Sequence, residues 1–143
     1  MIVARILAAK GREVVTTQPH RTLAEAAALL TARKIGAAVV TDGQGRILGM
    51  LSERDICIAV GEDGAAALDD AISKHMTTEV LTAFEDETVE QTMAKMTHRR
   101  CRHLPVVEDG RLAGIVSIGD VVKFRLEQLE HEHQAMREYI ATA

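Results

Sequence analysis

Aromatic residues are nearly absent from this sequence: Trp does not occur, and Phe, Trp and Tyr together make up 2% of its 143 residues. Hydrophobic residues still account for 47% of the chain, which is enough for one well-formed core. We therefore expect that core to be aliphatic. Cysteine is also scarce, and Cys57 and Cys101 form neither a metal-binding nor a redox spacing, which predicts two free thiols in a reducing cytoplasm.

Long apolar runs and an excess of positive charge are lacking as well. The apolar runs are far shorter than the roughly 20 residues that a membrane-spanning helix requires. Residues 1–9 are interrupted by Arg5 and do not form a convincing signal peptide. The formal net charge of −4 argues against general binding to nucleic acids or anionic membranes. We expect neither of these as a partner.

What the sequence does contain is the same pattern twice. Apolar-Gly-apolar-apolar-Ser-x-x-Asp occurs at 48–55 and again at 113–120. Upstream, residues 34–40 align with residues 101–107, and the small change of spacing falls in the turn that follows them. Because the length difference lies in a turn while the segments on both sides stay in register, the pattern predicts a duplicated fold.

Each half predicts the order helix, strand, helix, strand, strand, helix from its hydrophobic periodicity and turn residues. In the first half the elements are expected at 3–7, 14–16, 22–30, 37–41 and 47–51, with the last helix beginning at Ser52. In the second half they are expected at 68–72, 80–82, 88–96, 104–107 and 112–116, with the last helix beginning at Ser117.

A unit of about sixty residues buries too little surface to be comfortable alone, so we expect the halves to pack together as one α/β (α+β) domain. The expected boundaries are a first repeat at 1–60, a linker at 61–67, a second repeat at 68–126 and a C-terminal helical extension at 127–143.

The Ser-x-x-Asp motif has two interpretations. It is typical of a helix N-terminus, with Ser as the N-cap and an acidic residue three positions later. It is also suited to a ligand site. Each copy follows a strand that contains Gly, which lets backbone approach a ligand and directs helix N–H groups at an anion. An Asp near a nucleotide can also accept hydrogen bonds from ribose hydroxyls. The two roles are compatible.

At these residues the sequence resembles a known family. The duplicated unit, the run at 103–107 (His-Leu-Pro-Val-Val) and the repeated Gly-apolar-apolar-Ser-x-x-Asp motif are similar to a tandem pair of cystathionine-beta-synthase (CBS) domains, the Bateman module, over residues 1–126. The resemblance implies that the repeats pack through their sheets with pseudo-twofold symmetry and leave two clefts for adenine-containing ligands. It also implies that Asp holds the ribose, Ser or Thr the phosphate, and backbone around the apolar-Pro-apolar run frames the base, with the Asp of one repeat serving a ligand framed by the other.

Carried over to this sequence, the resemblance implies two candidate sites. The first comprises Ser52, Arg54, Asp55, Met76, Thr77, Val80, Arg102, His103, Leu104 and Pro105. The second comprises Lys10, Val15, Ile35, Gly36, Ala37, Ser117 and Asp120. Arginine binds phosphate bidentately and His can add a donor, so we expect the first site to favour phosphorylated ligands. The aligned positions are Arg54, Arg102 and His103 in the first site and Gly119, Ile35 and Gly36 in the second.

The C-terminal segment carries an apolar seam with heptad-like spacing. Its members are Val122, Leu126, Leu129, His133, Met136 and Ile140. This predicts an amphipathic helix that needs a partner surface, either its own domain or a second subunit. Because the resemblance implies that such modules often dimerise, we expect a homodimer in which this helix takes part.

No set of catalytic acid, base, nucleophile or metal ligands emerges from the sequence. His131 and His133 lie two apart on a helix and point in different directions, so we expect no metal. The resemblance therefore implies a non-catalytic adenine-nucleotide sensor that binds AMP, ADP, ATP, NAD, NADH or S-adenosylmethionine and signals by conformational change to a regulated protein. A ligand-free homodimeric scaffold and an enzyme acting on nucleotides are the alternatives.

Overall fold

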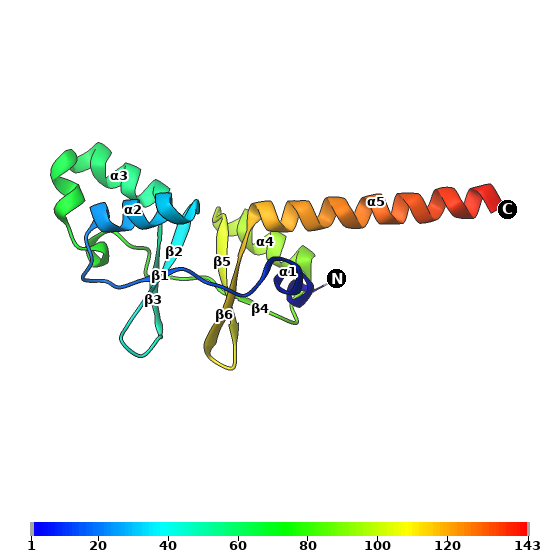
Figure 1. Ribbon diagram of the computed structural model, residues 1–143, viewed down its shortest axis with the longest axis horizontal. Coiled ribbons are helices and arrows are strands. Elements are labelled where there is room, and N and C mark those ends of the chain that lie inside the picture. The colour runs from blue at the N-terminus through cyan, green and yellow to red at the C-terminus, as the bar shows by residue number, and fades with distance from the viewer. Residues whose placement is uncertain (1, 143) are drawn as a thin grey trace.

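The computed structural model describes residues 2–142 and shows two three-stranded sheets, each with its own helices (Figure 1). The first half comprises α1 (Val3–Lys10), β1 (Thr16–Thr17), α2 (Leu23–Arg33), β2 (Ala37–Thr41), β3 (Ile47–Ser52) and α3 (Glu53–Asp63). The second comprises the short 3₁₀ helices η1 (Ala65–Asp69) and η2 (Ile72–Lys74), then β4 (Ala83–Phe84), α4 (Val89–Arg99), β5 (His103–Glu108), β6 (Arg111–Ser117) and α5 (Ile118–Thr142).

The two sheets share one topology. Their strand orders are β1-β2-β3 and β4-β5-β6, with the first pair parallel and the second antiparallel in each sheet. Both antiparallel pairs also shift register at matching places, between Val40 and Thr41 and between Val106 and Val107. The duplicated α/β fold that the sequence predicts is confirmed. The strands expected at 14–16 and 80–82 are shorter and later than predicted, because pairing with β2 and β5 begins only at Thr16 and Ala83.

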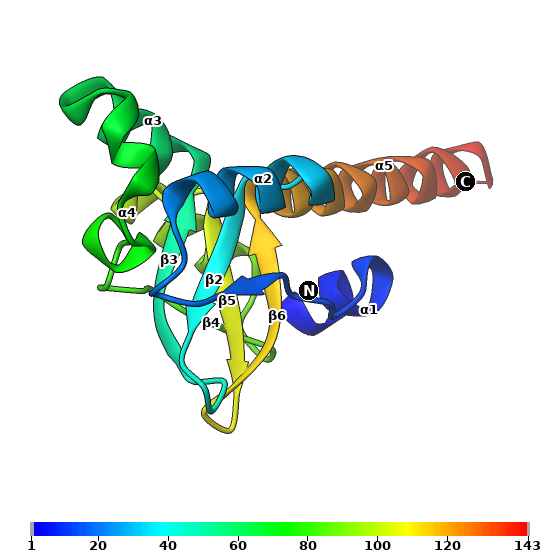
Figure 2. The ribbon, with the colours of Figure 1, turned by 60° about the vertical axis from the view of Figure 1, so that its left-hand side comes forward.

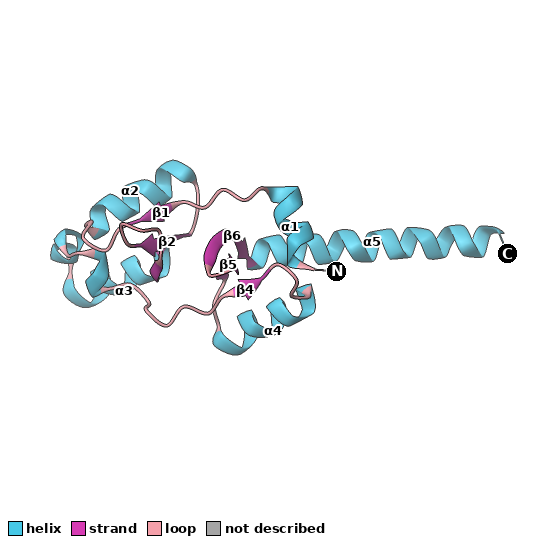
Figure 3. Cartoon of the chain, turned by 90° about the horizontal axis from the view of Figure 1, so that it is seen from below, coloured by secondary structure: helices cyan, strands magenta, loops and turns pink. Residues whose placement is uncertain are grey.

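The opening segments of the two halves are exchanged. Val3, Ile6 and Leu7 of α1 are buried in the core of the second half, together with Leu104 and Val116 among others. Figures 2 and 3 show α1 beside β6, and in Figure 3 it lies apart from the first sheet. The periodicity of α1 predicts an apolar face but does not say which core that face completes.

The second opening segment makes the reciprocal contact. Ala67 of η1 and Ile72 of η2 belong to the core of the first half, with Leu23 and Leu51. The backbone shows the same exchange, since Leu23 N–H donates to the carbonyl oxygen of Asp70 at 3.0 Å. Each core is therefore completed by the other half, which agrees with the expectation of one domain.

The motif glycines make room for the exchanged segments. A Cβ atom at Gly49 would lie 2.6 Å from the carbonyl oxygen of Thr77, and one at Gly114 would lie 2.8 Å from Cδ2 of Leu7. Met50 and Thr77 also exchange two backbone hydrogen bonds of 2.9 Å. We expected these glycines to let the backbone approach a ligand, whereas in the structure Thr77 and Leu7 of the chain itself make the close approach.

The segment expected as a linker, 61–67, contains the last turn of α3 and the start of η1. Helix α3 continues through Gly61 and stops before Gly64, whose φ of +76° favours glycine. The domain boundaries given above stay a prediction.

Helix α5 is one continuous element that starts at the second Ser-x-x-Asp motif and extends away from both sheets (Figure 1). Its apolar seam is open: Leu126 is 56% exposed and Ile140 is 66% exposed. The domain itself does not cover the seam, which leaves a second subunit as the predicted partner. Within residues 2–142, no helix combines the length and the apolar character needed to cross a bilayer.

The exchange predicts that Gly49 is required for stability. Gly49→Ala places a methyl group against the Thr77 carbonyl, so we expect the free energy of unfolding to fall by about 1–3 kcal/mol. Urea unfolding followed by circular dichroism measures this. Gly43→Ala is the matched control, because a Cβ there meets nothing within 4 Å. Equal stability of the two variants would contradict the steric role of Gly49.

Candidate functional site

The two Ser-x-x-Asp motifs form reciprocal caps at the N-termini of α3 and α5. Asp55 N–H donates to Ser52 Oγ at 3.2 Å, and Ser52 N–H donates to Asp55 Oδ2 at 2.9 Å. The second copy repeats this arrangement, with distances of 3.1 Å from Asp120 N–H to Ser117 Oγ and 2.9 Å from Ser117 N–H to Asp120 Oδ2. The capping interpretation of the motif is confirmed.

Capping leaves part of each carboxylate available. Both Asp55 and Asp120 are half-buried, and the hydrogen bonds that reach them from residues 2–142 end on Oδ2. The Oδ1 atoms accept none from the described chain, although a carboxylate oxygen can accept two. Each motif can therefore hold its helix and still accept a hydroxyl donor.

Asp120 differs from Asp55 because Lys10 binds it. The Lys10 Nζ lies 2.5 Å from Asp120 Oδ2 and also donates to the carbonyl oxygen of Ile115 at 2.9 Å. Burial acts to raise the pKa of Asp120, but hydrogen bonds from Lys10 and from the Ser117 N–H lower it, and the pKa lies below its usual value. Asp55 has no such cation within the described chain, since its hydrogen bonds come from Ser52.

His103 lies where the first residues of the two middle strands meet. A Cβ atom at Gly36 would be 3.5 Å from His103 Cε1 and 3.5 Å from Glu53 Oε1, so these groups surround one small space. Burial lowers the pKa of His103, the charges of Glu53 and Asp120 raise it, and Lys10 and Arg102 lower it; the net pKa is below its usual value. The imidazole is therefore mostly neutral at pH 7 and offers one donor and one acceptor.

The structure brings most of the second predicted set together. Lys10 and Ser117 both donate to Asp120 Oδ2. Gly36 lies beside His103, whose pKa is affected by the charges of Lys10 and Asp120. His103 is a predicted member of the first site, but its contacts and neighbouring charges lie with this second group. Ala37 is buried as the first residue of β2, and Ile35 and Val15 are half-buried. The carbonyl oxygen of Val15 accepts a hydrogen bond from Val39 N–H of β2.

The first predicted set is more dispersed. Ser52 and Asp55 are bonded, and Met76 and Thr77 lie against β3 at Gly49. The side-chain hydrogen bonds of Asp55 within the described chain are with Ser52, and none reaches the second half. Of the remaining members of this first set, Arg54 and Arg102 are exposed, Val80 is half-buried, and Leu104 and Pro105 are buried in β5.

Glu53 is a member of the second group that the sequence reasoning missed. Its carboxylate lies near Gly36 and raises the pKa of His103. Its position directly after Ser52 was the available signal, but the aligned residue of the other motif is Ile118, so the repeat gave no reason to select it.

A groove of about 510 Å³ opens between α2 and α3 of the first half. Its lining is mainly aliphatic and reaches the second group at Ile35, Gly36 and Glu53. The remaining lining residues are Ala27, Leu30, Thr31, Lys34, Ile56 and Cys57.

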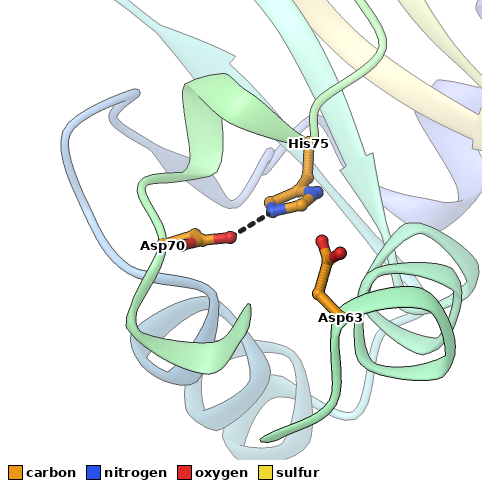
Figure 4. A group of neighbouring side chains, drawn as sticks. All are labelled: Asp63, Asp70 and His75. Carbon is orange, nitrogen blue, oxygen red and sulfur yellow. Dashed lines mark hydrogen bonds and ion pairs between the residues drawn. The ribbon is translucent and has the colours of Figure 1, made fainter. Parts of the chain in front are cut away.

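One other polar cluster in the described chain has donor atoms close enough for a metal ion. The donor atoms of Asp63, Asp70 and His75 lie within 4.8 Å of one another (Figure 4). His75 Nε2 is 2.8 Å from Asp70 Oδ2, and Lys74 Nζ is 3.5 Å from the same oxygen. The His75 hydrogen bond lowers the pKa of Asp70, with a smaller effect of Lys74. Within this cluster Asp70 is therefore held by the hydrogen bond with His75 and the ion pair with Lys74, in the segment that connects the halves.

Neither cysteine has the surroundings of a nucleophile. Cys57 is exposed and Cys101 is half-buried, and both are free thiols. Burial raises the pKa of Cys101, which keeps the thiol protonated at neutral pH.

The Lys10–Asp120 pair predicts a pH-dependent contribution to stability. Because the folded-state pKa of Asp120 is depressed, the pair stabilises the fold above the unfolded pKa of about 3.9, and the effect disappears as pH falls through the folded pKa. We expect Lys10→Met to lower the free energy of unfolding by about 1 kcal/mol at pH 7 and by much less near pH 3. Urea unfolding at the two pH values measures the difference.

The control for this experiment is Lys123→Met, the same substitution at an exposed position of α5 with no ion pair in the described chain. It should change stability little at either pH. A Lys10→Met effect of the same size at both pH values would contradict the assignment.

Comparisons with known proteins match both halves. The family profile described as CBS domain matches residues 9–62 and 70–127. The CBS domain-containing protein YhcV of Bacillus subtilis is 35% identical over 112 residues, which make up 76% of this chain and 76% of YhcV.

Solved structures agree. The CBS-domain containing protein ATU1752 from Agrobacterium tumefaciens is 50% identical, with a TM-score of 0.86 over 87% of this chain and 99% of that one. The CBS domain pair of protein MJ0100, solved in complex with 5′-methylthioadenosine and S-adenosyl-L-methionine, is 28% identical, with a TM-score of 0.80 over 90% of this chain and 98% of that one.

Proposed function

Because this chain belongs to the CBS-domain family, we propose that it is a regulatory module that binds an adenine-containing nucleotide between its two repeats and performs no catalysis of its own. In this proposal the bound ligand changes the arrangement of the repeats, and a regulated protein responds to that change. A ligand can shift such an equilibrium only by the difference between its affinities for the two states.

The observation that carries the proposal is the free Oδ1 atom on each half-buried capping Asp. A ribose has two adjacent hydroxyl donors, which a carboxylate of fixed orientation can accept. The helix N-terminus beside each Asp favours a phosphate group. The adenosine derivatives bound by the MJ0100 pair, at 28% identity, have the ribose that these carboxylates suit.

The base would lie among aliphatic groups, because the sequence has no Trp and few other aromatics. Half-buried Val15 and Val80 and the buried Leu104–Pro105 segment are the proposed contacts. Adenine would then be recognised by slotting between side chains and by backbone hydrogen bonds rather than by aromatic stacking.

The first cleft is proposed as the stronger nucleotide site. Its Asp55 has no lysine to displace, and the exposed guanidinium groups of Arg54 and Arg102 are free to bind phosphate. At the second cleft Asp120 is already paired with Lys10. The proposed ligands are AMP, ADP, ATP, NAD or NADH.

A thermal-shift panel of AMP, ADP, ATP, NAD, NADH and S-adenosylmethionine tests this function. At 100 times its dissociation constant, a ligand adds about 2.7 kcal/mol to stability, which is a readily measured rise in Tm. We expect at least one ligand to stabilise the wild type. Asp55→Ala should weaken its binding about tenfold or more, and Asp120→Ala should weaken it less.

Asp86→Ala is the control, because this exposed carboxylate lies in a turn outside both clefts. Equal losses in Asp55→Ala and Asp120→Ala would contradict the asymmetry between the sites. If no adenosine ligand raises the Tm of the wild type, the ligand-free scaffold is the better description. Nucleotide turnover that disappears in Asp55→Ala would contradict the non-catalytic assignment.

We also propose that the chain forms a homodimer through α5. The seam of this helix is apolar at heptad-like positions and is exposed along its length. A partner helix would bury Leu126, Leu129 and Met136, which the protein's own domain leaves open.

The dimer predicts that a charge in the seam produces monomers. Leu126→Glu would bury an unpaired carboxylate between helices, so we expect the dissociation constant of the dimer to rise by at least about tenfold. Sedimentation velocity over a concentration series measures this. Glu127→Gln changes the adjacent residue outside the seam and should leave the dimer intact. A monomeric wild type would contradict the proposal.

A further inference from the structure

We propose that Lys10 makes the second cleft selective for phosphorylated nucleosides over neutral ones. Its ammonium group binds Asp120 until a phosphate group of the ligand replaces that carboxylate as its partner. This inference rests on the proposed function and gives the Lys10 side chain the role of discriminating phosphorylated from neutral ligands.

The position of Lys10 is set by the exchanged helix. Lys10 is the last residue of α1, whose buried face is held in the core of the second half through Val3, Ile6 and Leu7. The helix ends at Gly11, with a φ of +102° and an N–H that donates to Leu7 O at 2.8 Å. The backbone at Lys10 is therefore anchored beside β6, and only its side chain has freedom to change partners.

The ammonium group is bonded on two sides. It donates to Asp120 Oδ2 and to the carbonyl oxygen of Ile115 on β6. The side chains of Lys10 and Asp120 are only 32% and 24% exposed, so water replaces this ion pair poorly when it is broken. The Ile115 contact also keeps the ammonium at the cleft when the carboxylate is taken by another donor.

Asp120 Oδ2 already accepts from Lys10 Nζ and from Ser117 N–H, whereas Oδ1 accepts no hydrogen bond from the described chain. A ribose that donates one hydroxyl to each oxygen of Asp120 therefore competes with Lys10 for Oδ2. A neutral nucleoside offers the displaced ammonium no negative charge, so the lost charge-assisted bond opposes its binding. A nucleoside monophosphate carries the missing anion, and a phosphate oxygen within reach of Lys10 restores a charged partner. Exchange of partners by Lys10 therefore favours the phosphorylated ligand.

The Asp of the first cleft has no lysine partner in the described chain. Asp55 is bonded to Ser52 and to no cation in the described chain. At the corresponding place on β3, the chain approaches through the backbone of Thr77, which pairs with Met50. Neutral nucleosides displace no ion pair there, so the discrimination by Lys10 is confined to the second cleft.

Isothermal titration with adenosine and with AMP tests the inference in full-length Asp55→Ala protein, in which the first cleft is weakened. Three further substitutions are compared in that background: Lys10→Met, Lys10→Arg and the control Lys74→Met. Lys74 lies at the end of η2 and pairs with Asp70, outside both clefts. The measured quantity is the ratio of the dissociation constants for adenosine and AMP.

We expect Lys10→Met to reduce the preference for AMP about tenfold, by weakening AMP binding and strengthening adenosine binding. Lys10→Arg keeps the charge and should retain the preference, and Lys74→Met should leave it unchanged. An unaltered ratio in Lys10→Met, with AMP still bound, overturns the role of Lys10 while the proposed function stands. If the wild type binds neither adenosine nor AMP, the role of Lys10 is overturned, and the proposed function fails with it only if no ligand of the thermal-shift panel binds either.

Discussion

Exchange of the opening segments is the constraint on which the rest of this structure depends. Helix α1 completes the core of the second half, and η1 and η2 complete the core of the first. Separating the halves would expose several fully buried side chains at once, each worth about 1.5–3 kcal/mol of burial. Under the proposed function, a ligand can therefore move the halves only while the exchanged segments stay packed, since the halves cannot part without exposing their cores.

The exchange also creates the difference between the two clefts. Lys10 and Asp120 are 110 positions apart in the sequence, and they meet because α1 packs on the half that carries Asp120. The two Ser-x-x-Asp motifs are locally equivalent caps. What distinguishes the carboxylates is the segment that crosses beside each one: a lysine side chain at Asp120 and a backbone bridge near Asp55.

Helix α5 joins two features that carry the proposals. Its N-terminus is the cap formed by Ser117 and Asp120, and its far end carries the exposed apolar seam. A single uninterrupted helix of 25 residues transmits a change in direction at one end as a displacement at the other. Under the proposed function, ligand binding at the second cleft and pairing of two chains would act on the same element.

The sequence by itself determined the architecture of each half and the positions of both motifs. Hydrophobic periodicity and the repeated Ser-x-x-Asp pattern were sufficient, because local propensity and capping depend on residues close together in the chain. Only the tertiary structure decided which core α1 completes, why Gly49 and Gly114 are glycines, and that Glu53 and His103 lie beside Lys10 and Asp120 at the second motif. These contacts unite residues distant in sequence, and an apolar face or a charged side chain does not encode which of several equivalent partners it will meet.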